Sequence, residues 1–188
     1  MKKEKILVKL PEGEFQVGVL VFENEDKKYL FNVYKEWISL SKKLKSLKSR
    51  AVNLPEGLSE SAFCLAMKDT VRVVGNISKA NTSFDCYNTK TNERIQVKAA
   101  SKIPDLTSFG PKSVWDKLYF LDFYREGNWD GSFDIYLIDN KYIYEHKVNK
   151  NQSFKDQQKQ TRRPRFSIVK SIIKENKLKP LKTFNLSN

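Results

Sequence analysis

The stretch DCYNTKTNERIQVKAAS (residues 85–101) decides the fold class, because it predicts two neighbouring strands of a sheet. Residues 83–87 and 94–99 mix apolar, β-branched and polar side chains in the alternating manner of half-buried strands. The polar residues 89–92 (TKTN) between them are typical of a tight turn. We therefore expect an antiparallel pair of strands that carries Asp85 in the first strand and Lys98 in the second.

The alternation of side chains along these strands predicts a polar cluster on one face. Successive side chains of a strand point to opposite faces of the sheet, so the register that buries the apolar residues also places the polar ones. The apolar set expected on the core face is Phe84, Cys86, Ile95 and Val97. On the opposite face, Asp85, Gln96 and Lys98 are then expected to converge.

Such a cluster could hydrolyse a phosphodiester. Asp85 can hold a hard divalent cation, Gln96 can offer it a neutral oxygen, and Lys98 can orient and help deprotonate a water. Mg²⁺ suits the site, because it binds through one or two carboxylates together with waters and a substrate phosphate. The positive charges would stabilise a pentacovalent phosphorus. The alternative is an ordinary exposed Asp–Lys pair, which contributes under about 1 kcal/mol.

The rest of the chain predicts helices mixed with strands. We expect a hairpin of residues 5–9 and 14–22, a helix over 28–48, a helix capped by Ser59, a strand over 70–74, a hairpin of 131–139 and 142–144, and a helix over 167–177. Residues 113–124 (SVWDKLYFLDFY) fit a helix or a strand equally. The predicted fold class is α/β (α+β mixed), in which a central mixed β-sheet is flanked by helices.

The distribution of charge predicts a polyanionic partner. The chain has a formal net charge of +13, and residues 147–188 carry twelve basic and two acidic side chains. Residues 42–50 carry five basic side chains and no acidic one, whereas residues 51–146 are nearly neutral. A basic surface kept for solubility is the alternative, but solvated surfaces usually mix both signs.

Several protein classes lack support in the sequence. Cys64 and Cys86 fit no zinc spacing and are expected to be buried, reduced thiols. His146 is the only histidine, so a histidine–metal nuclease or a Cys–His hydrolase lacks its residues. There is no Walker loop or GxGxxG motif, so an enzyme built on a nucleotide cofactor is not expected. No apolar run approaches the roughly 20 residues of a membrane span, and the first residues lack the apolar core of a signal peptide. We expect no membrane association and a cytoplasmic location, in a bacterium given the resemblance described next.

Asp85 followed on the next strand by Gln96, Val97 and Lys98 resembles the PD-(D/E)XK nuclease motif, with Gln96 where the second acidic residue usually stands. The following text, AAS (residues 99–101) and LTSFGPKSVWD (residues 106–116), is similar to a group of small type II restriction endonucleases that cut short palindromes, interrupted GC-rich ones among them. The resemblance covers about residues 54–166. It implies a PD-(D/E)XK restriction-endonuclease-like fold and a Mg²⁺ cofactor.

The resemblance also implies roles for individual residues. Asp85 would be the metal-binding acid, Gln96 the second ligand position and Lys98 the catalytic lysine. Glu60, on the helix before the sheet, resembles an acid that many of these folds place there, and it could supply the charge that Gln96 lacks. Glu93 is a rival for the second acid, but it is expected to belong to the turn, because it should not share a face with Gln96 and Lys98.

DNA binding is expected from two groups of residues. Arginine can pair bidentately with guanine or clamp phosphates, so the first group is Arg162, Arg163 and Arg165. The second group follows the catalytic strand and could grip the DNA backbone beside the cut: Lys102, Lys112 and Ser113. Pro164 favours an extended backbone, so Arg163 and Arg165 should project to the same side.

The function expected from the sequence is a type II site-specific deoxyribonuclease with one domain over residues 1–188. It comprises an N-terminal strand and helix region (1–53), a catalytic core (54–146) and a basic DNA-binding part (147–188). A palindromic site favours a homodimer, and the resemblance implies a cognate DNA methyltransferase that acts on the same site without a stable complex. The alternatives are a non-catalytic DNA- or RNA-binding protein and a structure-selective repair nuclease of the same fold.

Overall fold

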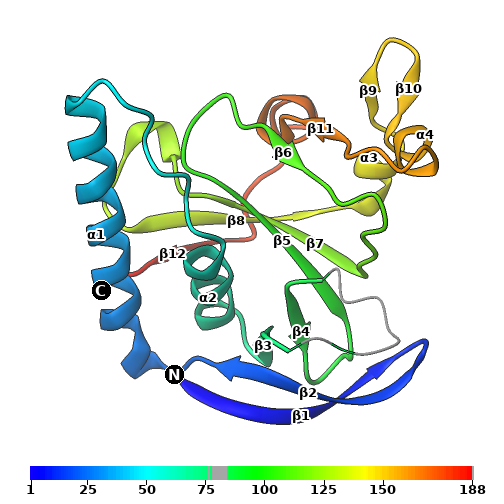
Figure 1. The fold of residues 1–188 in the computed structure, drawn as a ribbon, viewed down its shortest axis with the longest axis horizontal. Coiled ribbons are helices and arrows are strands. Elements are labelled where there is room, and N and C mark those ends of the chain that lie inside the picture. The colour runs from blue at the N-terminus through cyan, green and yellow to red at the C-terminus, as the bar shows by residue number, and fades with distance from the viewer. Residues whose placement is uncertain (76, 78–83, 188) are drawn as a thin grey trace.

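A computed structural model describes residues 1–75, 77 and 84–187 (Figure 1). Its largest element is a sheet of eight strands: β1 (Lys2–Leu10), β2 (Gly13–Val21), β3 (Thr70–Val73), β4 (Cys86–Asn88), β5 (Arg94–Ala100), β7 (Lys117–Asp122), β8 (Ser132–Ile138) and β12 (Lys182–Asn185). Two smaller sheets pair β6 (Thr107–Ser108) with β11 (Arg165–Phe166), and β9 (Lys147–Asn149) with β10 (Gln152–Ser153).

The helices are few and lie around this sheet. They are α1 (Lys27–Ser46), α2 (Glu56–Ala66), α3 (Asn140–Tyr144) and α4 (Phe154–Lys159), with short 3₁₀ helices at Asn24–Asp26 and Arg125–Gly127 and a π-helix at Val169–Lys174. Within the described ranges, no helix is both long and apolar enough to span a bilayer.

The strand order of the large sheet is β1-β2-β3-β4-β5-β7-β8-β12. Strands β5 and β7 are parallel and the other neighbours are antiparallel, so the expected mixed sheet and α/β class are confirmed. The predicted hairpin of β4 and β5 is also confirmed, with Cys86 opposite Ile95 and Tyr87 opposite Arg94.

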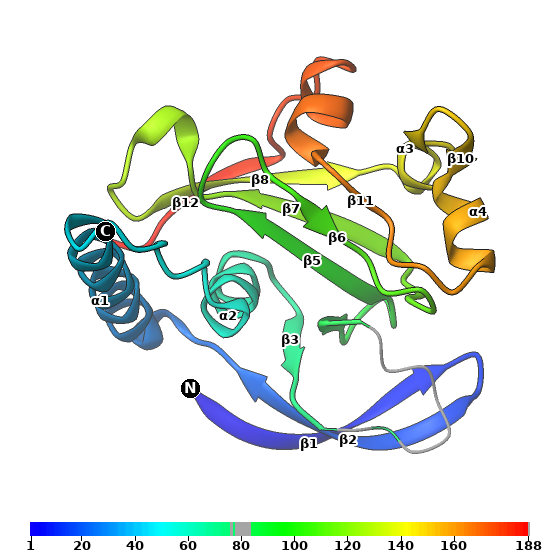
Figure 2. The same cartoon turned by 45° about the horizontal axis from the view of Figure 1, so that its top comes forward.

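The sheet divides next to β5 (Figure 2). Strand β5 pairs with β7 along its length, from Ile95 to Ala100, but it pairs with β4 only at Arg94 and Ile95. Beyond Ile95, the strands β1 to β4 diverge from the rest of the sheet. The edge of β5 that faces β4 is therefore open over its second half.

Apolar side chains pack on both faces of the sheet. Helices α1 and α2 cover one face, where Trp37 and Phe63 belong to the same buried cluster as Ile95 and Val97. A second cluster, around Phe109, lies on the other face and includes Ile172 of the π-helix. Three aromatic residues of β7 and its flanks are buried: Trp115 and Phe120 in the second cluster, and Phe123 in the first. Cys64 and Cys86 are free and buried, as expected.

The hairpin predicted between residues 131–139 and 142–144 is wrong. Strand β8 ends at Ile138, and the residues after it form helix α3. The Asp139 carboxylate accepts a hydrogen bond from the backbone N–H of Lys141 at 2.9 Å, so this polar turn caps a helix instead of closing a hairpin. The partners of β8 are β7 and the C-terminal strand β12, which the sequence did not predict.

Two other boundaries also differ from expectation, and one open choice is settled. Helix α2 begins at Glu56, so Ser59 lies inside it and donates its hydroxyl hydrogen bond to the Glu56 carbonyl at 3.0 Å. The open choice at residues 113–124 is settled as a strand, β7. The predicted final helix is the π-helix at Val169–Lys174.

The face expected for Phe84 is wrong as well. Phe84 packs in a third cluster with Tyr87, beneath the β1–β2 hairpin, whereas Cys86 packs with Ile95. The reason is that Asp85 lies in a bend before β4, so the strand alternation does not extend back to Phe84. Ser83, which we expected to begin this strand, lies outside the described residues.

Candidate active site

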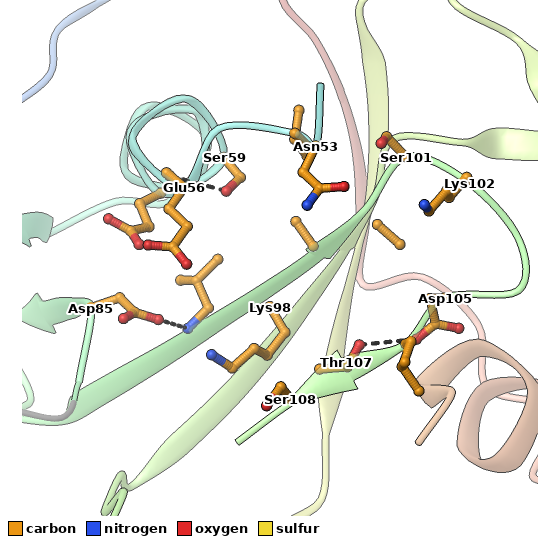
Figure 3. A pocket seen from close by; sticks show the side chains of 16 residues that line it. Asn53, Glu56, Ser59, Asp85, Lys98, Ser101, Lys102, Asp105, Thr107 and Ser108 are labelled. Carbon is orange, nitrogen blue, oxygen red and sulfur yellow. Dashed lines mark hydrogen bonds between the residues drawn. The ribbon is translucent and has the colours of Figure 1, made fainter. Parts of the chain in front are cut away.

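A pocket of about 520 Å³ lies where β4 and β5 separate (Figure 3). Its wall on one side comes from the start of α2 and the residues before it: Asn53, Leu54, Glu56, Ser59 and Glu60. Asp85 and the second half of β5 lie at its centre, and residues 101, 102 and 105–108 form the opposite wall. The open edge of β5 thus lies inside the pocket.

Asp85 connects the two diverging strands through its side chain. Its Oδ2 accepts a hydrogen bond from the backbone N–H of Val97 at 2.8 Å and another from the side-chain amide of Gln96. Its own backbone N–H donates to the Ile95 carbonyl at 2.9 Å. Burial raises the pKa of Asp85, and the nearby charge of Lys98 and the Val97 hydrogen bond oppose that rise.

Glu60 reaches the pocket from α2 and is paired with an arginine. Its Oε2 lies 2.6 Å from Nε of Arg72, on β3. Burial raises the pKa of Glu60 to about 7, the charge of Asp85 adds to the rise, and Arg72 opposes it. Arg72 was not predicted from the sequence, although an arginine inside the apolar strand TVRV (residues 70–73) is a signal for a buried partner.

Lys98 and Gln96 are neighbours on β5 with different environments. The Lys98 side chain lines the pocket, and its Nζ lies 5.8 Å from the ring centroid of Phe109. Gln96 is 2% exposed and does not line the pocket; its amide nitrogen donates to Asp85. The predicted cluster is thus brought together, with the nitrogen of Gln96 facing the Asp85 carboxylate.

Two further acids lie near these residues. Glu56, which the sequence analysis did not single out, lines the pocket one turn before Glu60. Glu93 lies in the turn between β4 and β5, as expected. Its carboxylate accepts a hydrogen bond from the Thr91 hydroxyl at 2.7 Å, and its Oε1 lies 3.7 Å from Nζ of Lys117. It is not part of the pocket.

The donor set of the pocket fits a hard divalent cation. Carboxylate oxygens are the ligands that Mg²⁺, Ca²⁺ and Mn²⁺ prefer. The raised pKa values of Asp85 and Glu60 mean that both carboxylates would be stabilised by a nearby cation. Across the described residues, no three His, Cys, Asp or Glu side chains form a preformed cage. Mg²⁺ needs none, because waters and a substrate phosphate complete its shell.

The expected DNA-binding residues lie in two places relative to the pocket. Lys102 lines it, and Arg165 pairs across β11 and β6 with the lining residue Ser108. Arg162 and Arg163 precede Arg165 and are exposed. Lys112 and Ser113 lie in the turn after β6, outside the pocket lining.

Asp105, another residue that the sequence analysis missed, ties the pocket wall to the C-terminal part. It is 5% exposed and lines the pocket. Its carboxylate accepts hydrogen bonds from the backbone N–H groups of Ile168 at 2.8 Å and Val169 at 3.2 Å, and from the hydroxyls of Thr107 and Ser167. A lone aspartate in a loop carries no signal for such a contact across 62 residues.

The sequence of the chain is similar to those of one family of known proteins. The family model described as Bsp6I restriction endonuclease matches residues 22–175. The type II restriction enzyme Bsp6I of Bacillus sp. (strain RFL6) is 36% identical to the chain over 163 residues, which is 85% of each protein. No solved structure matches.

Proposed function

The chain belongs to the Bsp6I restriction endonuclease family, a family of site-specific DNA-cleaving enzymes, and from this premise we propose that its pocket hydrolyses double-stranded DNA with Mg²⁺ at a short palindromic sequence. One observation supports this pocket as the place of catalysis. Glu60, Asp85 and Lys98 come from α2, a bend and β5, yet they line one pocket. Two acids and a lysine at the point where a sheet divides support a PD-(D/E)XK-like site.

In this proposal Asp85 and Glu60 hold the cation. Each presents a carboxylate to the pocket, and their mutual repulsion makes a cation favourable between them. Gln96 takes the place of the second acid of the motif, and its hydrogen bond orients Asp85. When bound, the cation supplies positive charge against the phosphate oxygens of the substrate.

Lys98 contributes the protein's own cation. Its side chain extends from β5, a central strand of the large sheet. In the pocket it can orient the attacking water and stabilise the negative charge that develops on the phosphoryl oxygens. The contact with the Phe109 ring limits the conformations of its long side chain.

DNA is held beside the cut by Lys102 of the opposite wall and by the arginines that lie next to that wall. Arg162, Arg163 and Arg165 can contact phosphates or guanine edges, and the register of β11 with β6 places Arg165 next to the pocket. A palindromic site is most simply read by a twofold dimer, so we propose a homodimer. A cognate methyltransferase in the same cytoplasm would protect the same site without a stable complex.

The test is incubation of the pure protein with supercoiled plasmid in Mg²⁺ and, in parallel, in EDTA. Discrete bands in Mg²⁺ alone, with a single palindrome at every sequenced end, are expected. Binding without cleavage would instead indicate a non-catalytic DNA-binding protein. Cleavage restricted to nicked or branched DNA would indicate a repair nuclease.

A further inference from the structure

The C-terminal end of α1 and the residues after it carry a basic surface that the proposed site does not use. We call it the α1 basic end: Lys42, Lys43, Lys45, Lys48 and Arg50. All five side chains are exposed. Within the part of the chain that the structure describes, none of them forms an ion pair with a carboxylate. Their charges are therefore available to a partner.

Hydrogen bonds attach this surface to the pocket wall. Nε1 of Trp37 and Oγ of Ser41, both on α1, donate to the carbonyl oxygen of Val52 at 3.0 and 3.5 Å. The next residue, Asn53, lines the pocket. Arg50 precedes Asn53 by three residues, so it lies within roughly 10 Å of it along the chain.

The α1 basic end and the arginine cluster lie on different sides of the pocket. Figure 3 shows Asn53 and Ser108 on opposite sides of Lys98. Arg50 is close in sequence to Asn53, and Arg165 is the cross-strand partner of Ser108. A duplex whose scissile phosphate lies at Lys98 would extend toward both groups.

A purely structural role explains only part of this surface. Lysines in the last turn of a helix stabilise its dipole by about 0.3–1 kcal/mol each, and Lys43 and Lys45 lie there. Lys48 and Arg50 lie beyond the end of the helix, where this effect has fallen off. The remaining chemistry is that of exposed cations that form no ion pair with a described carboxylate, and such cations suit the phosphates of a nucleic-acid backbone.

We propose that the α1 basic end is a second phosphate-binding surface, which holds the DNA backbone on the side of the pocket away from the arginine cluster. The inference rests on the proposed function, because it takes DNA as the substrate in the pocket. It adds a contact that positions the duplex without reading its sequence.

The test compares two variants that each remove two exposed charges. One is Lys45→Gln with Arg50→Gln; Lys48 is left unchanged because its backbone is left-handed, with φ of 56°. The control is Lys28→Gln with Lys68→Gln, since both side chains are exposed and Lys28 lies roughly 25 Å from Lys45 along α1. Affinity for a cognate and a random duplex is measured in EDTA against salt, together with phosphate ethylation interference.

The first variant should bind both duplexes more weakly and flatten the plot of log affinity against log salt by about 1.8, or 0.9 for each lost phosphate contact. Ethylation of phosphates on one flank of the cut should no longer interfere. The control should match the wild type. If the wild type binds and cleaves DNA while both variants share its salt slope, or if only cognate affinity falls, the second surface is refuted and the proposed function stands. If the wild type neither binds nor cleaves DNA, both proposals fail.

Discussion

The Asp85 carboxylate accepts a hydrogen bond from the backbone N–H of Val97 at 2.8 Å. This bond lies just beyond the last paired residues of β4 and β5, where backbone pairing between the two strands would otherwise continue. A side chain thus replaces a backbone acceptor at the point where the sheet divides. The bond satisfies a backbone donor that the opening would leave unpaired, and it holds the carboxylate inside the pocket. Structure and proposed chemistry therefore depend on the same oxygen atom.

Asp85→Asn and Lys98→Ala should each lower DNA cleavage by about 10²–10³-fold or more, because the first removes the negative charge that holds the cation and the second removes the ammonium group that stabilises the phosphoryl oxygens. Asn keeps the acceptor for Val97, so far-ultraviolet circular dichroism should stay unchanged. Lys90→Ala, in the exposed turn before β5, is the control. Cleavage at a near wild-type rate by either pocket variant would show that the site is assigned wrongly.

Gln96→Glu should lower the free energy of unfolding of the metal-free protein, and added metal should restore part of that loss. The amide of Gln96 donates to Asp85, so a carboxylate in its place would meet a like charge in a buried site. We expect urea unfolding in EDTA to show a loss of about 1–3 kcal/mol, which Mg²⁺ partly restores.

The same Gln96→Glu variant should keep measurable cleavage activity and shift its metal preference, because Glu restores the usual charge of the motif. Assays with Mg²⁺, Mn²⁺ and Ca²⁺ check this expectation. Complete loss of activity with normal metal binding would mean that Gln96 does not act near the cation.

Glu60 should make the stability of the metal-free protein depend on pH. Burial raises its pKa from 4.5 to about 7, so the native state holds a proton that the unfolded state has lost between these values. Its contribution to the free energy of unfolding therefore falls as pH rises from 4.5 to 7, by up to about 3 kcal/mol.

Glu60→Gln removes this titration. Urea unfolding of both proteins in EDTA at pH 5 and pH 8 should show that the variant gains stability relative to the wild type at the higher pH. Comparing the two pH values cancels any change in stability that is the same at both, and the interaction with Arg72 is already contained in the pKa of Glu60. An unchanged difference would mean that Glu60 is ionised throughout.

Arg163→Ala with Arg165→Ala should weaken DNA binding, because both arginines are exposed on either side of the buried Pro164. Loss of phosphate contacts would reduce affinity for all duplexes and flatten the salt dependence by about 1 per contact. Loss of base contacts would cost about 1–3 kcal/mol for each good bidentate pair, on the cognate duplex alone. Unchanged affinity for both duplexes would remove the arginines from the DNA interface.

Local patterns in the sequence were sufficient for much of the fold. The hairpin β1–β2, helix α1 and the pair β4–β5 follow from alternation, helical periodicity and a polar turn, which act over a few residues. The convergence of Asp85 with Lys98 also follows, because it needs only one turn and the register of two adjacent strands.

The sequence by itself determined the class of sheet, the closeness of Asp85 and Lys98 where β4 and β5 meet, and the concentration of positive charge near the C-terminus. Tertiary structure alone decided the division of the sheet beside β5, the pairing of Arg72 with Glu60, and the attachment of Asp105 to residues 167–169. The physical reason is that these contacts join segments whose approach depends on packing of the whole core, and no local preference of either segment encodes its partner.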